Sequence, residues 1–377
     1  MNFELDDEQR LLADSAERFL TQSYSFESRR QRVKQGRQLD HDVWQAFADA
    51  GWFHLPFSEA EGGLGGRLQD SMVLMQTLAK GLIIEPLWAN TYLAGSLIKR
   101  INHPLKQPWL ESLMAGKGHF ALAVHEYEQA FSITNSCNTL ATHEATGYRL
   151  NGRKCVVLNA ELAQWIFVLA NIDDELALLA VERDTAGVHV SGHRLVDGSR
   201  AAEVTFNNVL IAEENRLQAS GGISLLMQQT LHEAGLALAA EACGIIDALM
   251  LTTLAFVKTR KQFGVVIGQF QALQHRLVNM FMMSENCRSL LYAATLKAEE
   301  RHDDALVVYH RLQAMVAEYG RHIAQECIQL HGGMGMTDEV MVGHYLKRLL
   351  CIESLTGDLR HHLLASIEPV STQANVA

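Results

Sequence analysis

Hydrophobic positions along the chain follow two periods, and the points where the period changes divide it into three parts. Up to about residue 117, apolar side chains recur at helical spacing, for example at Leu12, Ala16 and Phe19. From about residue 118 short apolar or alternating segments follow, and the helical period returns at about residue 221. The pattern predicts an α+β protein that is mostly α. We expect an N-terminal helical domain over residues 1–117, a β domain over 118–218 and a C-terminal helical bundle over 219–377.

The middle part carries segments with the length and composition of strands, and we expect a small barrel or sandwich. Asn151-Gly152 predicts a two-residue hairpin turn between two of them. Further turns are expected at residues 184–187, at Gly192 and at residues 197–198. The predicted strands are 120–124, 148–150, 155–158, 165–169, 176–180, 188–190 and 204–206.

The C-terminal part predicts a four-helix bundle. No proline occurs between Trp109 and Glu368, so nothing interrupts these helices covalently. In the N-terminal part, helices are expected over residues 70–82 and 88–98, on either side of Pro86. The expected C-terminal helices are 225–258 (one helix or a kinked pair), 271–301, 304–329, 338–348 and 357–366.

Composition narrows the class of protein. The 377 residues are 48% hydrophobic and 20% charged, which is typical of a soluble globular protein and excludes wholesale disorder. The net charge of −11 argues against a general nucleic-acid binder. Six scattered cysteines without a CxxC pair predict reduced, mostly buried thiols. The acidic, amphipathic start and the lack of an apolar run near ~18 residues predict a cytoplasmic protein that does not span a membrane.

The first stretch with candidate chemistry is residues 260–275, RKQFGVVIGQFQALQH, which predicts a turn between two helices. Arg260 offers a fixed fork of donors suited to a phosphate or pyrophosphate. Phe263 and Gly264 would let a ring and bare backbone lie close to a flat ligand. Gly268 breaks the helical pattern before Gln271 restarts it.

The second stretch is residues 329–339, QLHGGMGMTDE. Gly332, Gly333 and Gly335 follow an apolar helix and leave backbone N–H groups available to an anion. Each stretch alone is typical of an ordinary helix end. Together, in this order and near the C-terminus, they resemble the acyl-CoA dehydrogenase family, flavoproteins that oxidise acyl-CoA thioesters. The helical, β, helical order of the whole chain resembles that family too.

The resemblance implies FAD as cofactor and acyl-CoA as substrate. In the family the flavin lies across a subunit interface, and a neighbouring chain's Arg-x-x-Phe-Gly turn and Gln-x-x-Gly-Gly loop hold its ADP half. A carboxylate base removes the substrate proton. The residues of this chain that match the neighbour-facing set are Arg260 and Gln262 for the pyrophosphate, Phe263 for a ring contact, Gln329, Gly332 and Gly333 for the ADP, and Ile267, Phe270 and Leu273 along the same groove.

The family's flavin-ring motifs do not match. A Thr-Glu-Pro-like turn and a later Gly-Ser-Asp correspond to AVHEYE at residues 123–128, which lacks the Thr, the Pro and the Gly-Ser-Asp. The Trp-Ile-Thr-Asn-Gly strand corresponds to VVLNA at residues 156–160. Leu158 stands where the family has a hydroxyl, and a leucine cannot make that contact with the flavin.

The family's base is also missing from its usual positions. The slot before Gly-Thr in the last turn holds Thr356, and the alternative Glu-Arg pair on the long helix corresponds to residues 234–235, Ala-Gly. Glu233 and Asp358 lie one or two positions away, and one position on a helix is a rotation of about 100°. We expect them to be solvated or helix-end carboxylates, and we assign no catalytic residue. His361 and His362 are expected to be surface or packing residues, without metal spacing.

The residues that match a neighbour's half of the flavin site are present, and the residues for the chain's own flavin ring and base are not. The sequence therefore predicts one subunit of a heterotetrameric acyl-CoA dehydrogenase, with a paralogous partner that supplies the ring site and the base. Such split enzymes resemble those that shorten steroid side chains, and the family passes electrons to an electron-transfer flavoprotein. Two alternatives stay open: a homo-oligomeric dehydrogenase that uses Glu233 or Asp358 as its base, and a non-catalytic scaffold of the same fold.

Overall fold

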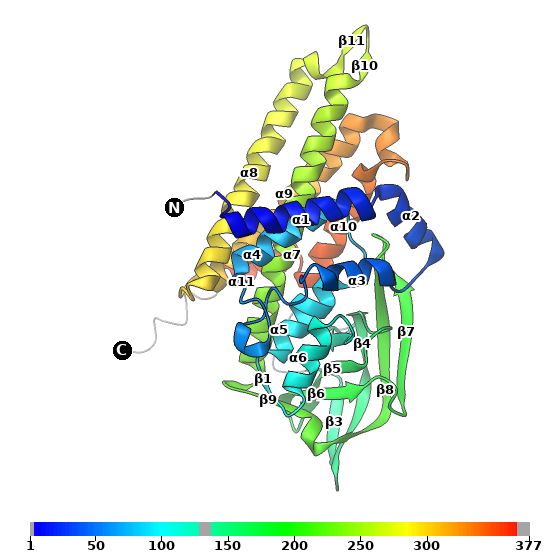
Figure 1. Ribbon diagram of the computed structural model, residues 1–377, viewed down its shortest axis with the longest axis vertical. Coiled ribbons are helices and arrows are strands. Elements are labelled where there is room, and N and C mark those ends of the chain that lie inside the picture. Colours follow the sequence, from blue (N-terminus) through cyan, green and yellow to red (C-terminus); the bar gives the residue numbers. More distant parts are fainter. Residues whose placement is uncertain (1–3, 128–136, 368–377) are drawn as a thin grey trace. The chain divides into compact units, whose positions relative to one another are not determined.

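The computed structural model describes residues 4–127 and 137–367, and the chain forms two compact units (Figure 1). One unit joins Met1–Arg30 and Arg67–Ile83 to Gly235–Ala377, and its described residues are almost entirely helical. The other joins Gln31–Gly66 to Ile84–Ala234 and contains the large sheet. The predicted mostly helical α+β class, with a sheet domain between helical domains along the chain, is confirmed.

Strands β1 to β9 of the described residues form one sheet. Their order is β1-β9-β6-β5-β3-β4-β8-β7, with β2 paired in parallel to β5. Alternating side chains such as Tyr148, Ile166 and Phe206 fill the core of this unit. The strands are β1 (Ile101–Asn102), β2 (Phe120–Ala123), β3 (Leu140–Glu144), β4 (Gly147–Leu158), β5 (Trp165–Ile172), β6 (Glu175–Glu182), β7 (Val188–Arg194), β8 (Arg200–Ala212) and β9 (Arg216–Ala219).

The predicted hairpin turn at Asn151-Gly152 is wrong. Strand β4 runs through both residues, and its register against β8 shifts between Leu150 and Gly152, which marks a β-bulge. A glycine is required at the bulge because a Cβ there would lie 2.7 Å from the Thr139 backbone. The turn between β3 and β4 lies instead at residues 145–146. The turn predicted at Gly192 is also wrong, because that residue pairs with Ala202 inside β7.

The helices predicted at 70–82 and 88–98 are present, and the pattern does not single out two others, α2 (Phe26–Gln35) and α6 (Lys106–Met114). Helix α2 escapes the hydrophobic pattern because its buried position is taken by Arg29, whose Nε donates to the Leu82 carbonyl at 2.7 Å. The segment predicted at 88–98 begins as a π-helix, η2 (Trp88–Ala94), and continues as α5 (Gly95–Ile98). The other N-terminal helices are α1 (Asp7–Ser23), α2 (Phe26–Gln35), α3 (His41–Asp49), η1 (Glu59–Glu61), α4 (Leu68–Ala79) and α6 (Lys106–Met114).

The C-terminal part is helical as predicted, and residues 225–258 lie within a single helix. The elements are α7 (Gly222–Thr259), α8 (Gln271–Glu299), α9 (Ala305–His331), α10 (Met341–Thr356) and α11 (Leu359–Ala365), with short 3₁₀ turns η3 (Glu213–Asn215), η4 (Ile267–Gln269) and η5 (Gly332–Met336). All six cysteines lie among the described residues as buried thiols outside any disulfide, as predicted.

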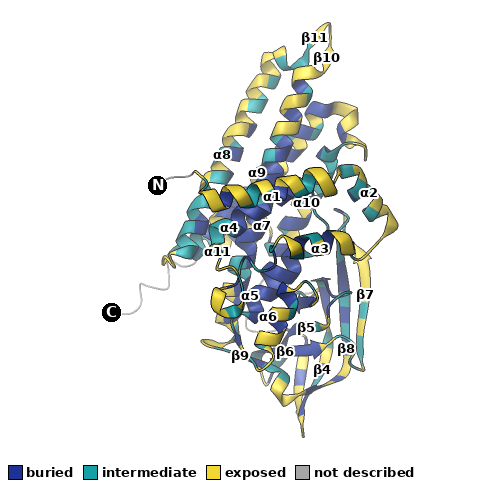
Figure 2. Cartoon of the chain, viewed as in Figure 1, coloured by how far each residue is buried: buried dark blue, intermediate teal, exposed yellow. Residues whose placement is uncertain are grey.

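Helix α7 is more apolar than expected from the sequence pattern, which predicts no run long enough to span a membrane. By length and composition it could cross a membrane, with a mean hydropathy of 1.8 over its most apolar window. Yet 83% of that window is buried inside the protein, and Figure 2 shows the middle of α7 as a buried element. Burial of this kind is typical of the core helix of a bundle.

Candidate functional site

The stretch after α7 forms an exposed hairpin, as the predicted turn between two helices requires. Strands β10 (Lys261–Gln262) and β11 (Val265–Val266) pair, and the Ile267 N–H donates to the Arg260 carbonyl at 2.9 Å to close the loop. Phe263 at the tip has φ of 55°, which is uncommon for a side chain of its size, and its ring is 91% exposed. The hairpin thus presents an aromatic face to whatever lies outside the chain.

Positive charge gathers at the base of this hairpin. Lys258, Arg260 and Lys261 are all exposed, and among the described residues none of the three has an ion-pair or hydrogen-bond partner for its side chain. The whole chain carries −11, so three unmatched cations within four residues are a candidate site for an anion. Arg260 adds the planar fork that can bind a phosphate through two parallel hydrogen bonds.

The second predicted stretch lies at the same end of the helical unit. His331, at the end of α9, stacks on Phe256 of α7 with ring centroids 4.3 Å apart, which brings the two turns together. Gln329 is exposed beside them. A Cβ added to Gly332 or Gly333 would meet nothing within 4 Å, so packing inside this chain does not demand a glycine at 333. Bare backbone at that position suits the approach of a ligand from outside.

The remaining predicted residues belong to the same hairpin. Gln262 is exposed in β10, and Ile267 is half-buried in η4. Phe270, 37% exposed, is the N-cap of α8, and Leu273 is half-buried in the first turn of that helix. The Phe270 ring lies 6.2 Å from that of Phe263 in an edge-to-face arrangement. The structure therefore places the nine candidate contact residues in or beside two neighbouring turns of the helical unit.

The part of the sheet that corresponds to the family's flavin-ring turn is occupied by a buried ion pair. Glu126 accepts from Lys154 Nζ at 2.6 Å, and the two side chains are 4% and 0% exposed. Glu126 also accepts from the Thr139 hydroxyl at 2.6 Å. Burial raises the pKa of Glu126, but these donors outweigh it and the pKa lies below its usual value. Glu128, the last residue of the matched stretch, lies outside the described residues.

The second ring-side segment is also committed to the fold. Asn159, with φ of 63°, donates from Nδ2 to the Phe120 carbonyl at 2.9 Å and to Asn90 Oδ1 at 3.2 Å. Asn90 belongs to the π-helix η2, so the asparagine common to the family's motif joins β4 to that helix. Leu158 beside it offers no hydroxyl, so this strand does not fit the contact that the family makes with the flavin.

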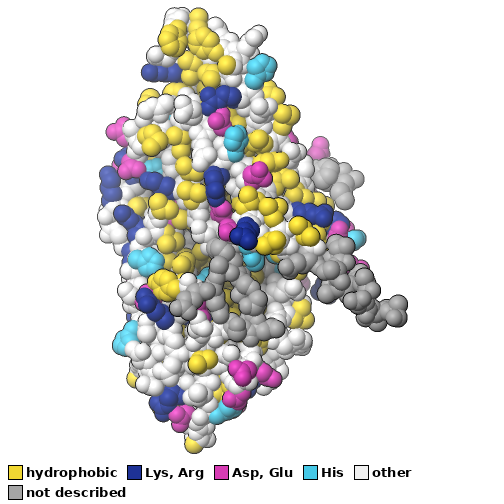
Figure 3. Space-filling view, turned by 180° about the vertical axis from the view of Figure 1, so that it is seen from behind, with side chains coloured by type: hydrophobic (Ala, Val, Ile, Leu, Met, Phe, Trp, Pro, Cys, Tyr) yellow, Lys and Arg dark blue, Asp and Glu magenta, His cyan; other side chains and the backbone are white. Residues whose placement is uncertain are grey.

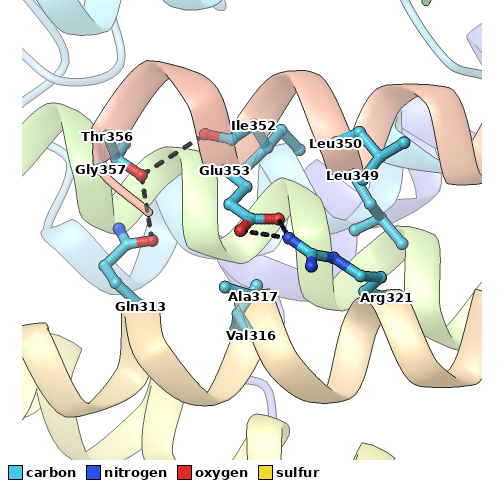
Figure 4. A pocket seen from close by; sticks show the side chains of 10 residues that line it. All are labelled: Gln313, Val316, Ala317, Arg321, Leu349, Leu350, Ile352, Glu353, Thr356 and Gly357. Atoms are coloured by element: carbon cyan, nitrogen blue, oxygen red, sulfur yellow. Dashed lines mark hydrogen bonds and ion pairs between the residues drawn. The ribbon is translucent and has the colours of Figure 1, made fainter. Parts of the chain in front are cut away.

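The slot of the family's base holds Thr356, at the end of α10. Its hydroxyl lies 3.4 Å from the Ile352 carbonyl and 3.5 Å from Gln313 Oε1, in the lining of a small pocket between α9 and α10 (Figure 4). Glu353, the one carboxylate among the described residues of that lining, is ion-paired with Arg321. The pocket therefore offers no unpaired carboxylate to act as a base.

The two relocated-base candidates are engaged elsewhere. Glu233 is 11% exposed, and its two carboxylate oxygens are paired with Lys99 and Arg100. Burial raises its pKa, but the two cations outweigh burial and hold the pKa below its usual value, which makes it a poor proton acceptor. Glu233 is thus neither solvated nor at a helix end, contrary to expectation. Asp358 is the expected helix-end carboxylate, because it caps α11 by accepting from the His361 N–H at 2.8 Å.

Replacing Glu233 by glutamine should lower stability and leave turnover nearly intact. The amide would leave Lys99 and Arg100 without their counter-charge, at a cost of about 2–3 kcal/mol in the free energy of unfolding. The matched variant Asp358→Asn keeps a good cap and should cost under ~0.5 kcal/mol. Thermal unfolding and dye reduction with acyl-CoA would measure both. A loss of turnover beyond about 100-fold with unchanged stability would identify that carboxylate as the base.

One cluster escapes the sequence analysis. His310 of α9 lies beside His361 and His362 of α11, with the Nδ1 atoms of His310 and His362 2.9 Å apart. These two residues are separated by 52 positions in the chain, so no local spacing could have signalled the contact. A histidine in a helix next to a His-His pair is not a motif by itself.

Domain models of one protein family match most of the chain. Models of the N-terminal, middle and C-terminal domains of acyl-CoA dehydrogenases match residues 6–117, 121–209 and 220–364. The L-prolyl-[peptidyl-carrier protein] dehydrogenase of a Serratia species is 29% identical over 97% of this chain and 97% of its own length.

Solved structures share the fold. PigA with FAD and proline has a TM-score of 0.90 and 25% identity, covering 99% of this chain and 100% of that one. A variant of the Tcur3481–Tcur3483 steroid acyl-CoA dehydrogenase has a TM-score of 0.85 and 23% identity, covering 98% and 99%. With three domain models matched in order along nearly its whole length, this chain belongs to the acyl-CoA dehydrogenase family.

Proposed function

We propose that this chain is one subunit of a cytoplasmic, hetero-oligomeric acyl-CoA dehydrogenase. It would hold the ADP half of an FAD whose reactive ring, together with the catalytic base, lies in a paralogous partner chain. One flavin would then serve each pair of unlike chains.

The family gives the chemistry within which this proposal stands. The chain is an oxidoreductase of the acyl-CoA dehydrogenase type, which acts on a CH–CH bond of an acyl-CoA thioester, and its cofactor is FAD. FAD, when bound, accepts the hydride from the substrate. The base that removes the proton has to be a carboxylate of suitable pKa close to the thioester.

The observation that carries the proposal is the contrast between two sets of residues. The hairpin and the α9 turn offer unmatched cations, an exposed ring and open glycines, as a flavin's ADP half requires. The ring-side strand has Leu158 in place of a hydroxyl, and the base slot has Thr356. A hydroxyl without an activating partner does not serve as a base of suitable pKa. The contrast supports a subunit that helps a neighbour's flavin and lacks a full site of its own.

In this role each residue has a simple task. The Arg260 fork would bind the two phosphates through charge-assisted hydrogen bonds, supported by Lys258 and Lys261. Phe263 would cover the flat ring from one side. Gly332 and Gly333 would let backbone N–H groups approach the ADP without a side chain between.

A partner is also supported by exposed apolar surface. The last turns of α7 and the first half of α8 carry large apolar side chains in i, i+3 and i+4 relation, next to the hairpin. Figure 3 shows hydrophobic side chains gathered at this end of the helical unit. The band on α7 and α8 consists of Leu251, Leu254, Val278, Phe281 and Met282, each at least 38% exposed. Such a band is rare on monomers and suits an interface between subunits.

The substrate proposal is a steroid side chain carried as a CoA thioester. Its support is the shared fold with a solved steroid acyl-CoA dehydrogenase whose name joins two chains. We further propose an electron-transfer flavoprotein as the electron acceptor, as the family resemblance implies.

Flavin stoichiometry tests the split site directly. The chain purified alone should hold less than about 0.1 FAD per chain, because the family's ring contacts and base are missing. Co-expressed with a paralogous chain that carries the Thr strand motif and the in-place Glu, it should yield one FAD per pair and reduce a dye with acyl-CoA. Absorbance at the flavin maximum and mass photometry give the numbers. A fully flavinylated, active homotetramer would rule the proposal out.

Two alternatives make different predictions for the same samples. A homo-oligomeric enzyme with a relocated base would be active alone and would lose activity on substitution of Glu233 or Asp358. A non-catalytic scaffold would bleach no dye with any thioester, whatever its partner.

The Serratia relative, named for a prolyl group on a peptidyl-carrier protein, suggests one more comparison. The active pair of chains can be given the same acyl group once on CoA and once on a carrier protein. The rates of dye reduction with the two thioesters would show which one it oxidises.

A further inference from the structure

Three histidines meet where α11 folds back onto α9. His310 comes from the first half of α9, and His361 and His362 are consecutive in α11. One ligand nitrogen from each lies within 4.8 Å of the other two. The ring centroids of His361 and His362 are 5.0 Å apart, and those of His310 and His362 are 5.2 Å apart. All three belong to the helical unit.

The cluster is partly sealed from solvent. His362 is 1% exposed, and its Nε2 is buried without a hydrogen bond of good geometry among the described residues. His310 and His361 are half-buried, which leaves an open side for entry. Gly357 makes room, because a Cβ there would lie 2.5 Å from His361 Cδ2 and 2.9 Å from His362 Nε2. The other ring nitrogen of His362, Nδ1, faces His310 and is the candidate ligand atom.

The donor atoms of the cluster determine which ions suit it. Three nitrogen donors suit zinc, cobalt, nickel or copper, and they do not suit magnesium or calcium, which prefer oxygen.

We propose that His310, His361 and His362 form a three-histidine site for a divalent transition-metal ion of the zinc class. At metal–nitrogen distances of ~2.0–2.1 Å a tetrahedral ion separates its ligands by roughly 3.4 Å. The 2.9 Å contact between the two Nδ1 atoms then has to lengthen by roughly half an ångström, which a rotation of the half-exposed His310 provides. A water molecule would take the fourth position on the open side.

The bound ion would join α11 to α9. The Thr356–Gly357 turn leads from α10 into α11 and borders the pocket of Figure 4. Fixing α11 would therefore fix this turn. The site uses none of the residues assigned to FAD, so it stands or falls independently of the proposed function.

Equilibrium dialysis of the full-length chain, with any partner that co-purifies, tests the proposal with Co²⁺ and Zn²⁺ as probes. The wild-type protein should bind one Co²⁺ per chain, with the intense visible absorption of a tetrahedral nitrogen site, and Zn²⁺ should displace it. Mg²⁺ should not. His310→Ala and His361→Ala should each weaken Co²⁺ binding by at least about 100-fold. Both side chains are half-buried, so both variants should fold, and circular dichroism would check this.

His322→Ala is the matched control, because His322 is an exposed histidine on the same helix α9. It should leave affinity and spectrum unchanged. Wild-type protein that binds no Co²⁺ at micromolar concentration would overturn the proposal. Wild-type affinity retained by either His310→Ala or His361→Ala would also overturn it, since the ion would then be held elsewhere.

Discussion

Replacing Arg260 by alanine should strip FAD from the assembled protein. The change removes the planar fork that we assign to the pyrophosphate and leaves that charge matched only by Lys258 and Lys261. Two charge-assisted hydrogen bonds are lost at once, so the dissociation constant of FAD should rise at least about 100-fold. Flavin absorbance per chain after gel filtration, followed by titration of the apo-protein with FAD, would measure the change.

Two comparison variants isolate the role of the fork. Arg260→Lys keeps the charge and loses the bidentate geometry, so its affinity for FAD should fall between those of the wild type and Arg260→Ala. Arg311→Ala removes an exposed arginine from the same helical unit and should leave flavin content unchanged. Full flavin content in Arg260→Ala would show that this turn does not hold the cofactor.

Replacing Lys154 by methionine should cause the largest loss of stability. Glu126 would keep its hydrogen bonds from Thr139. It would lose Lys154, its only ion-pair partner among the described residues, in a site that is almost fully buried. Breaking a buried ion pair from one side costs about 3–5 kcal/mol in the free energy of unfolding. The midpoint of urea unfolding, followed by tryptophan fluorescence and circular dichroism, would report it.

The double variant and an exposed pair serve as controls. Glu126→Gln combined with Lys154→Met removes both charges and should cost less than the sum of the single changes. Glu144→Gln breaks the exposed pair with Arg149 in the neighbouring strands and should cost under ~1 kcal/mol. A Lys154→Met protein as stable as the Glu144→Gln protein would mean that the buried pair does not stabilise the sheet unit.

The Glu126–Lys154 pair makes the stability of the protein depend on pH. The folded-state pKa of Glu126 is lowered, so its contribution to stability is complete above the ordinary carboxyl pKa of about 4.3 and is lost as the pH falls through the folded value. Unfolding midpoints measured from pH 7 down to pH 3 should therefore fall more steeply in the wild type than in Glu126→Gln.

The sequence predicts most of the fold because its periods are long and clean. Helices α7 to α9 follow from uninterrupted helical spacing, with bounds within a few residues of those expected. The wrong predictions arise where the residue type suggests one local structure and the tertiary contacts require another. Gly152 has the signature of a turn and sits in a bulge, because the approach of the Thr139 backbone excludes a side chain there. Helix α2 is not predicted from the hydrophobic pattern, because its buried position is taken by Arg29, a charged residue that donates to a backbone carbonyl.

The sequence by itself determined the order of helical, sheet and helical parts, the chemical character of the two flavin-side turns and the missing hydroxyl and base at Leu158 and Thr356. Only the tertiary structure decided what surrounds the charged and titratable groups. Glu233 between two cations, Glu126 against Lys154 and His310 against His362 are contacts between residues at least 28 positions apart. Local spacing governs which residues share a helix face. The burial of a side chain and the charges around it depend on which faces pack together, and that depends on how the whole chain folds.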